Sequence, residues 1–356
     1  MNDTKLDNIK TKHIYGNGSV QVDVSIVIPT YKRIDLLRKC LKSIIAQNKV
    51  SNLSIEVVVC SNDCNFQIND LGIWLDPAIF NIYVNEKNVG MCENMNRCFQ
   101  NANGKYIAYV QDDDVLLPNY LEEIKKIIVS DDIEKFDCII PNRYYYMPDS
   151  ALTTQFGKKA IRNMYIKNYI CRFFQIGKAI PKFQKINPYD TMITMYPFYS
   201  GGPTCGILFK KECLYNFGGF DIRYPYGFDY SFFMNFSEKY NVGLYNEYLS
   251  IYMTSDSASN RPEVQFDFFK ARYDYIQKNH QKYNISNRRK EVIVYCTYSG
   301  YPLETQKMIE NEMPLTYVSK IVCIFYNLWA RMKVYKSGGY RRKSCSRQLQ
   351  KWYKEL

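Results

Sequence analysis

Short apolar runs rich in β-branched residues alternate with helical patterns over the first third of the chain, and this alternation leaves few folds open. The runs cover residues 23–29, 54–62, 80–84 and 105–110. The helical patterns, in which apolar residues recur on one face, cover residues 33–47, 89–104 and 117–129. Continuous apolar runs are typical of strands buried on both faces. We therefore predict a doubly wound α/β fold, with a mostly parallel sheet and helices on both of its faces.

Polar residues follow three of the predicted strands. Pro-Thr-Tyr (29–31) ends the first, Ser-Asn-Asp (61–63) the second, and three consecutive aspartates (112–114) follow the fourth in YIAYVQDDDVLLP. Because ligands of such sheets bind at the carboxyl ends of the strands, these residues should share one rim. Adjacent carboxylates suit Mg²⁺ or Mn²⁺ that bridges to phosphates. The alternative is a polar turn that caps the next helix, but three aspartates beside two other polar strand ends favour a metal–diphosphate site.

The chain has 356 residues, enough for one large domain or two ordinary ones, and a net charge of +12. Two segments carry that charge: residues 143–190 hold nine Lys or Arg against two acids, and residues 331–356 hold nine against one. Such segments meet nucleic acid, an anionic membrane or a phosphorylated substrate, or are simply solvated. Nothing resembles a motif that reads nucleic acid, so we expect no nucleic-acid partner.

The residue composition argues against several kinds of site. Twelve cysteines lie without metal-ligand spacing, so we predict free buried thiols. With only His13 and His280, a histidine zinc site or a Ser-His-Asp triad is not expected. The polar start MNDTKLDNIKTKH and the lack of a long uninterrupted apolar stretch predict neither a signal peptide nor a spanning helix, and therefore a cytoplasmic location.

The second half of the chain is less regular. A strand, a short helix and a glycine turn are predicted over 206–221, a helix over 227–243 and a strand over 248–254. An apolar stripe at helical spacing follows over 316–335. We divide the chain into an N-terminal arm, two successive halves of the α/β region and a basic amphipathic C-terminal extension, with the bounds 1–22, 23–142, 143–260 and 261–356.

Four motifs, in order, make residues 23–260 resemble family 2 glycosyltransferases, which have the GT-A fold. They are VSIVIPTYKR (24–33), NVGMCENMNRC (88–98), YIAYVQDDDVLLP (106–118), and GGFD (218–221) followed by GFDYSFFM (227–234). The resemblance implies transfer of a sugar from a nucleotide-sugar, usually a UDP-sugar, to an acceptor hydroxyl with inversion. A divalent cation would assist the leaving diphosphate and a general base would activate the acceptor.

The resemblance also implies roles for individual residues. Those expected to bind the nucleotide-sugar are Pro29, Thr30, Tyr31, Arg33, Asp63, Gly90, Asn96, Asp112 and Asp113. The Ser61–Asn62 pair is the alternative to Asp63 for the same position of the family motif. Asp114, with Asp112, is the expected ligand of Mn²⁺ or Mg²⁺. Asp229 is the candidate general base, with helix capping as its alternative role, and Asp221 is expected to be structural.

The sequence departs from the family in one segment. YMTSDSASN (252–260) has Met253 and Ser255 where relatives carry Arg and His, so a histidine metal ligand from this segment is doubtful. A non-catalytic relative that only binds nucleotide-sugar therefore stays open. A sugar-phosphate nucleotidyltransferase is the other alternative, but IPTYKR lacks the glycine-rich loop that it would need.

The acceptor is expected to be a saccharide, or a sugar on polyprenyl diphosphate, in the synthesis of a bacterial surface polysaccharide. The basic segments would then meet this acceptor, or the inner face of the cell membrane as a peripheral contact. The alternative for the C-terminal helix is packing on the domain or on a second subunit of an oligomer.

Overall fold

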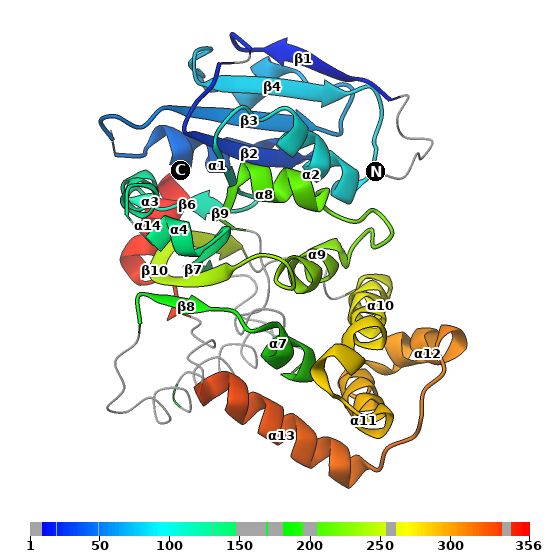
Figure 1. Ribbon diagram of the computed structural model, residues 1–356. Coiled ribbons are helices and arrows are strands. Elements are labelled where there is room, and N and C mark those ends of the chain that lie inside the picture. The colour runs from blue at the N-terminus through cyan, green and yellow to red at the C-terminus, as the bar shows by residue number, and fades with distance from the viewer. Residues whose placement is uncertain are drawn as a thin grey trace.

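The computed structural model describes residues 9–18, 20–48, 50–130, 132–146, 169, 181–194, 205–253, 261–336 and 343–356. One mixed sheet runs through the molecule in the order β1-β4-β3-β2-β5-β9-β7-β10-β6 (Figure 1). Its parallel part consists of β2 (Val24–Thr30), β3 (Ile55–Ser61), β4 (Phe80–Asn85) and β5 (Tyr106–Tyr109). These are the four strands predicted from the apolar runs, and the predicted fold class is confirmed.

The other half of the sheet is mixed. It is built from β6 (Val115–Leu116), β7 (Cys138–Tyr146), β9 (Ile207–Lys210) and β10 (Val242–Met253). β9 runs antiparallel to both β5 and β7, whereas β10 runs parallel to β7. Three short strands complete it: β1 (Thr11–Tyr15) on β4, β8 (Phe183–Lys185) on β10, and β11 (Lys343–Ser344) on β7.

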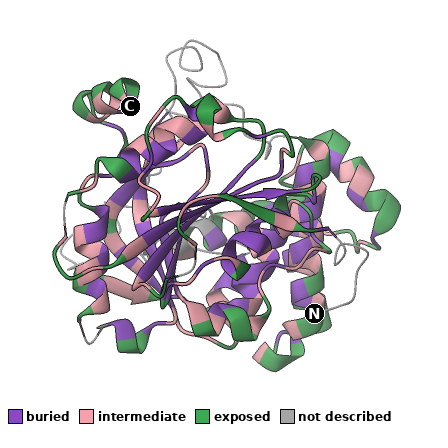
Figure 2. Cartoon of the chain, turned by 90° about the horizontal axis from the view of Figure 1, so that it is seen from above, coloured by how far each residue is buried: buried purple, intermediate pink, exposed green. Residues whose placement is uncertain are grey.

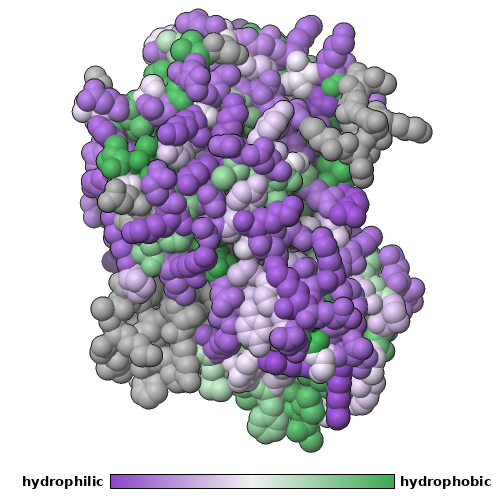
Figure 3. All heavy atoms as spheres, in the orientation of Figure 1, coloured by the Kyte–Doolittle hydropathy of each residue, from purple (hydrophilic) through white to green (hydrophobic). Residues whose placement is uncertain are grey.

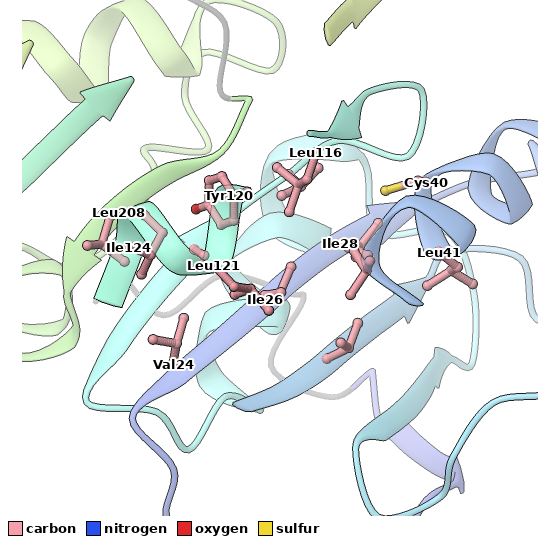
Figure 4. Packing of buried hydrophobic residues seen from close by; sticks show 14 of the residues in the cluster. Val24, Ile26, Ile28, Cys40, Leu41, Leu116, Tyr120, Leu121, Ile124 and Leu208 are labelled. Carbon is pink, nitrogen blue, oxygen red and sulfur yellow. The ribbon is translucent and has the colours of Figure 1, made fainter. Parts of the chain in front are cut away.

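Helices cover both faces of the sheet. α1 (Ile34–Ile45) and α3 (Tyr120–Ile128) pack on one face, and α2 (Met91–Gln100), α8 (Lys211–Phe217) and α9 (Phe228–Phe236) on the other. The period of two along β2 explains this, since Ile26 and Ile28 face α1 and α3 while Val27 faces α2 (Figure 4). Buried residues accordingly fill the sheet and the inner sides of the helices (Figure 2).

The C-terminal helices form a core of their own below the sheet. Besides Met234 of α9, five helices contribute to it: α7 (Pro188–Thr194), α10 (Pro262–Asn279), α11 (Asn287–Tyr298), α12 (Leu303–Glu312) and α13 (Lys320–Lys336). The small α4 (Asp132–Lys135) follows α3. The last helix, α14 (Arg347–Glu355), returns to the sheet, where Tyr353 is buried beside Tyr146.

Two elements differ from the expected bounds. The helix expected over 227–243 ends at Phe236, and the strand expected at 248–254 begins at Val242. The chain turns at Ser237–Asn241, and Asp137 accepts a hydrogen bond from the N–H of Asn241, which leads directly into β10. The apolar pattern continued across this turn, so periodicity alone could not place it.

Other features of the described residues bear on the composition arguments. Eleven cysteines lie in this part of the chain, all as free thiols and nine of them buried, which confirms the prediction for these residues. Within the described ranges, no helix combines the length and the apolar character that crossing a bilayer requires. Most of the basic segment 143–190 lies outside the described residues.

Gly104 fixes the start of β5 against β2. Its N–H donates to Ser25 Oγ (2.6 Å), which in turn donates to the buried carboxylate of Glu56 (2.6 Å). A Cβ at Gly104 would lie 2.4 Å from the backbone nitrogen of Ser25. The glycine therefore permits the close approach of the two strands whose ends carry the polar rim.

We expect Gly104→Ala to lower the free energy of unfolding by about 1–3 kcal/mol, because the added methyl group forces these strands apart. Gly300→Ala is the matched control, since the nearest atom to its Cβ would lie 3.4 Å away. Urea unfolding of the two variants checks this. Equal stabilities would contradict a close approach at Gly104.

Candidate active site

The three aspartates after β5 lie against the carboxyl end of β2. Thr30 Oγ1 donates to Asp112 Oδ2 (2.7 Å), and Arg33 Nη1 donates to both Asp112 Oδ1 and Asp113 Oδ2 (3.0 Å each). Asp112 is buried, whereas the Arg33 side chain is 45% exposed. Parallel pairing of β2 with β5 thus brings Thr30, Arg33 and two of the aspartates together, as the strand order predicts.

Asp114 is the most deeply buried of the three and keeps an unused oxygen. Its Oδ1 accepts a hydrogen bond from the N–H of Met253 (3.2 Å), while Oδ2 has no hydrogen-bond partner among the described residues. Burial raises the pKa of Asp114 well above its usual value, and the charge of Asp113 adds to this; Met253, Cys205 and Arg143 offset it in part. A buried carboxylate oxygen without a partner is costly unless a cation meets it.

The neighbouring carboxylates are also hard to ionise. Burial raises the pKa of Asp112 to about 6 and raises that of Asp113, although Arg33 lowers both. The guanidinium groups of Arg33 and Arg143 therefore only partly balance the three adjacent acids. Additional positive charge would stabilise their ionised forms.

The donor set fits a divalent ion that is held partly by substrate. The described residues contain no group of three or more His, Cys, Asp or Glu side chains placed to hold a metal. Mg²⁺ and Mn²⁺ commonly take one or two carboxylates and complete their coordination with phosphate oxygens and water. Asp114 offers a free oxygen for this, whereas Asp112, the second expected ligand, would first have to release Thr30 or Arg33.

The turn after β2 has an uncommon backbone conformation. Lys32 has φ +55°, in the left-handed region that non-glycine residues seldom adopt, and it lies between the exposed Tyr31 and Arg33. This turn directs Arg33 back toward the aspartates and leaves the Tyr31 ring on the surface beside the strand end. Pro29 is buried within β2.

Buried asparagines connect the other strand ends. Asn85, the last residue of β4, donates to Asn62 Oδ1 (2.9 Å) and Asn94 Oδ1 (2.8 Å). Asn62 donates to the carbonyl of Gly90 (2.9 Å), and Gly90 has φ +86° at the start of α2. The sequence analysis missed Asn85 and Asn94; for Asn85, a polar residue at the end of an apolar run was the available signal.

Two expected nucleotide-binding residues lie differently from the rest. Asn96 has both sides of its amide engaged by the backbone of Phe220, at 2.8 and 2.9 Å, so it clasps α2 to the GGFD turn. Asp63 is half-buried after β3, where its Oδ1 accepts the N–H of Asn65 (3.1 Å). The structure thus brings Asp63 near the rim, but not Asn96.

Asp229 lies in the first turn of α9. Burial raises its pKa to about 7; the N–H of Tyr230, which donates to Oδ1 (2.7 Å), and the charge of Arg272 lower it, while the charge of Asp267 raises it. A carboxylate with a pKa near neutrality is suited to accept a proton. Asp229 fulfils the alternative role of helix capping only in part, because at the start of the helix its carboxylate accepts a hydrogen bond from the N–H of the adjacent residue.

Asp267, which the sequence analysis missed, anchors the start of α9. From α10, its Oδ2 accepts the N–H groups of Tyr226 (2.7 Å) and Gly227 (2.6 Å). A Cβ at Gly227 would lie 2.6 Å from the carbonyl oxygen of Asp267, so the contact requires glycine. Nothing local in the sequence indicates it, because the partner comes from a later helix.

The charges of the aspartate rim and of Asp229 both act on one buried side chain, Tyr109. Burial raises the pKa of Tyr109 most, and the charges of Cys98, Asp112 and Asp229 add to it. Both acidic groups are therefore within electrostatic range of the same hydroxyl on β5. Segment 254–260, with the expected serines and the missing histidine, lies outside the described residues.

Comparisons with known proteins agree with this arrangement. Residues 25–186 match the family model described as Glycosyl transferase family 2. The chain is 32% identical over 109 residues to the glycosyltransferase GlyA of Streptococcus pneumoniae serotype 4, which is 30% of this chain and 15% of that protein. It is 24% identical over 116 residues to the uncharacterised glycosyltransferase YibD of Escherichia coli K12, 32% of this chain and 33% of that protein. The matched part thus spans about a third or less of these relatives.

Among solved structures, the crystal structure of S. aureus TarS 1–349 in complex with UDP-GlcNAc superposes with a TM-score of 0.53 at 14% identity, over 88% of this chain and 91% of that one. This likeness shows the fold, which is the GT-A fold expected from the sequence. The chain thus matches glycosyl transferase family 2 through residues 25–186 and shares the GT-A fold with this structure.

Proposed function

We propose that this chain transfers a sugar from a nucleotide-sugar, with UDP as the nucleotide, to a hydroxyl of a saccharide acceptor, with inversion at the anomeric carbon. The acceptor class we favour is a sugar carried on polyprenyl diphosphate, which the chain would meet at the cytoplasmic face of the membrane. The observation that carries the proposal is the convergence of Thr30, Arg33 and the three aspartates at the strand ends of a family 2 fold. TarS, which shares the fold, binds UDP-GlcNAc.

The rim residues would bind and orient the donor. The exposed Tyr31 ring and the half-buried Asp63 flank the ends of β2 and β3, where a nucleoside would stack and accept hydrogen bonds. Gly90 lies below, and its positive φ shapes the loop that enters α2. Arg33, held between Asp112 and Asp113, is placed to turn from these carboxylates toward a diphosphate.

Asp114, with Asp112 or Asp113, would hold Mn²⁺ or Mg²⁺. When bound, the ion supplies positive charge for the departing diphosphate. The chain itself contributes three adjacent carboxylates whose pKa values are raised by burial. A bound cation would stabilise their ionised forms.

Asp229 would accept the proton of the acceptor hydroxyl. The clasp from Asp267 fixes the start of α9, and the charge of Arg272 favours the ionised form of Asp229. The proton leaves the acceptor oxygen for the Asp229 carboxylate as that oxygen bonds to the anomeric carbon, and the nucleoside diphosphate leaves with the electrons of the broken bond.

Asp229→Asn should abolish transfer, by about 10²–10⁴-fold, because the amide cannot accept the proton. Binding of UDP-sugar, measured by calorimetry, should be retained. The folded-state pKa lies above the unfolded value, so ionisation of Asp229 costs stability as the pH rises. The variant should therefore melt at or above the native temperature at pH 8.

Asp221→Asn serves as the matched control for this experiment. Asp221 is a nearby carboxylate that pairs with Arg223 (2.6 Å), and its variant should keep transfer within a few-fold. Comparable turnover by Asp229→Asn and native protein would overturn the assignment. If native protein binds the donor but transfers sugar to none of a panel of saccharide acceptors, the result would instead favour the non-catalytic alternative.

The pH profile tests the environment of Asp229. The base must be ionised, so kcat/KM should fall about tenfold per pH unit below pH about 7. Asp267→Asn removes a like charge and should shift this acid limb to lower pH, while its amide oxygen can still accept the two N–H groups. An unchanged limb would show that another group controls the profile.

Asp114→Asn should weaken Mn²⁺ binding in the presence of UDP at least about tenfold, since it removes an ionised ligand oxygen. Electron paramagnetic resonance of free Mn²⁺ measures this without turnover. Asp35→Asn is the control, because Asp35 is exposed and pairs only with Arg38 on α1. Equal Mn²⁺ affinity of the two variants would place the ion elsewhere.

A further inference from the structure

Within the part of the chain that the structure describes, helix α13 packs on its neighbours by one face. Cys323 and Ala330 are buried on that face, and the Tyr326 hydroxyl donates to the carbonyl of Ile193 in α7. Lys333 forms an ion pair with Asp190 of α7 (2.7 Å). These contacts fix the orientation of the helix, so the opposite face is presented outward.

The outward face of α13 is apolar. It consists of Ile321, Ile324, Phe325, Leu328 and Met332, whose spacing places them on one side of the helix, and we call it the α13 apolar face. Ile321 is 67% exposed, Phe325 69% and Leu328 50%. Hydrophobic residues gather there at the lower end of the molecule (Figure 3), where α13 lies in Figure 1. A contiguous exposed apolar surface of this kind marks an interaction site.

Positive charge borders this face. The 17 residues of α13 include four Lys or Arg and no acid. A depression of about 390 Å³ separates α13 from the start of α11; its lining residues are Ser286, Arg288, Arg289, Val292, Tyr326 and Trp329. Two exposed arginines thus lie beside a half-exposed tryptophan at the edge of the apolar face.

We propose that α13 lies in the headgroup region of an anionic phospholipid bilayer. The α13 apolar face would enter the acyl boundary, Trp329 would lie at the polar level, and Arg288 and Arg289 would meet lipid phosphates in the depression. Helices that lie on membranes combine these three features. This deepens the proposed function, because a lipid-linked acceptor is met at a bilayer, but it stands on different residues from the donor site.

A second copy of the chain fits this face less well. In a two-fold contact the same surface meets itself, so two α13 helices without any acid, each bordered by Arg288 and Arg289, would come together. Like charges would then face one another at the edge of the apolar contact. An anionic surface complements both the apolar face and its border.

Flotation with vesicles tests the proposal on the full chain. Native protein should float with phosphatidylcholine vesicles that contain phosphatidylglycerol, and much less with phosphatidylcholine alone. Phe325→Glu/Leu328→Glu should weaken binding at least about tenfold, and Arg288→Gln/Arg289→Gln several-fold, only on anionic vesicles. All four side chains are exposed, so melting temperatures should match the native value.

Two double variants serve as matched controls. Val129→Glu/Tyr215→Glu changes equally exposed apolar residues on α3 and α8, and Arg347→Gln/Lys351→Gln changes exposed cations on α14. Both should bind vesicles as native protein does. Loss of binding in these controls equal to that of the α13 variants would overturn the proposal, as would a native dimer in sedimentation that Phe325→Glu/Leu328→Glu converts to monomer.

A depth measurement locates the helix directly. In a Trp74→Phe/Trp352→Phe background, Trp329 is the only tryptophan, and brominated lipids should quench its fluorescence. No quenching on vesicles that bind the protein would contradict insertion of α13. Asp229→Asn should bind and be quenched as native protein is, so failure of the proposed transfer and failure of membrane binding are separately visible.

Discussion

The rim depends on the close pairing of β2 with β5. Gly104 lets the two strands approach, and their carboxyl ends then place Thr30 and Arg33 against Asp112 and Asp113. The buried Asp112 and Asp114 remain there with the partly exposed Asp113 and Arg33. The raised pKa values of the three carboxyls reflect the cost of keeping their charge out of water, and a nearby cation would lower that cost.

The raised pKa of the proposed base, Asp229, has the same physical cause as those of the rim aspartates, but different charged residues surround it. Asp229 is half-buried and also carries a raised pKa, but the charged groups that act on it are Arg272 and Asp267 from α10 instead of other rim residues. The charges of Asp112 and Asp229 both act on the buried Tyr109. Binding a cation and accepting a proton both require an ionised carboxylate, so each group depends on nearby positive charge to offset its raised pKa.

The features that could be predicted from the sequence are those that depend on local residue patterns. Apolar runs located β2, β3, β4 and β5, and the strand-end residues Thr30 and Asp112 were expected at one rim and lie there. Contacts between segments that are far apart in the sequence could not be predicted. Asp267 touches Gly227 from another helix, and β7 was missed because CIIPNRYYY mixes a proline and polar residues into a strand. Asn96 matched a motif, yet its side chain clasps the GGFD turn.

The clasp between α9 and α10 has a consequence for how this chain can diversify. The matched family segment, residues 25–186, contains the rim but neither Asp229 nor the residue that anchors it. In the proposed function, recognition of the donor and handling of the acceptor would therefore be encoded in different stretches of the gene. A chimera that exchanges acceptor preference between relatives would have to carry α9 and α10 as one unit, since a junction between them would separate Gly227 from the carboxylate that holds it.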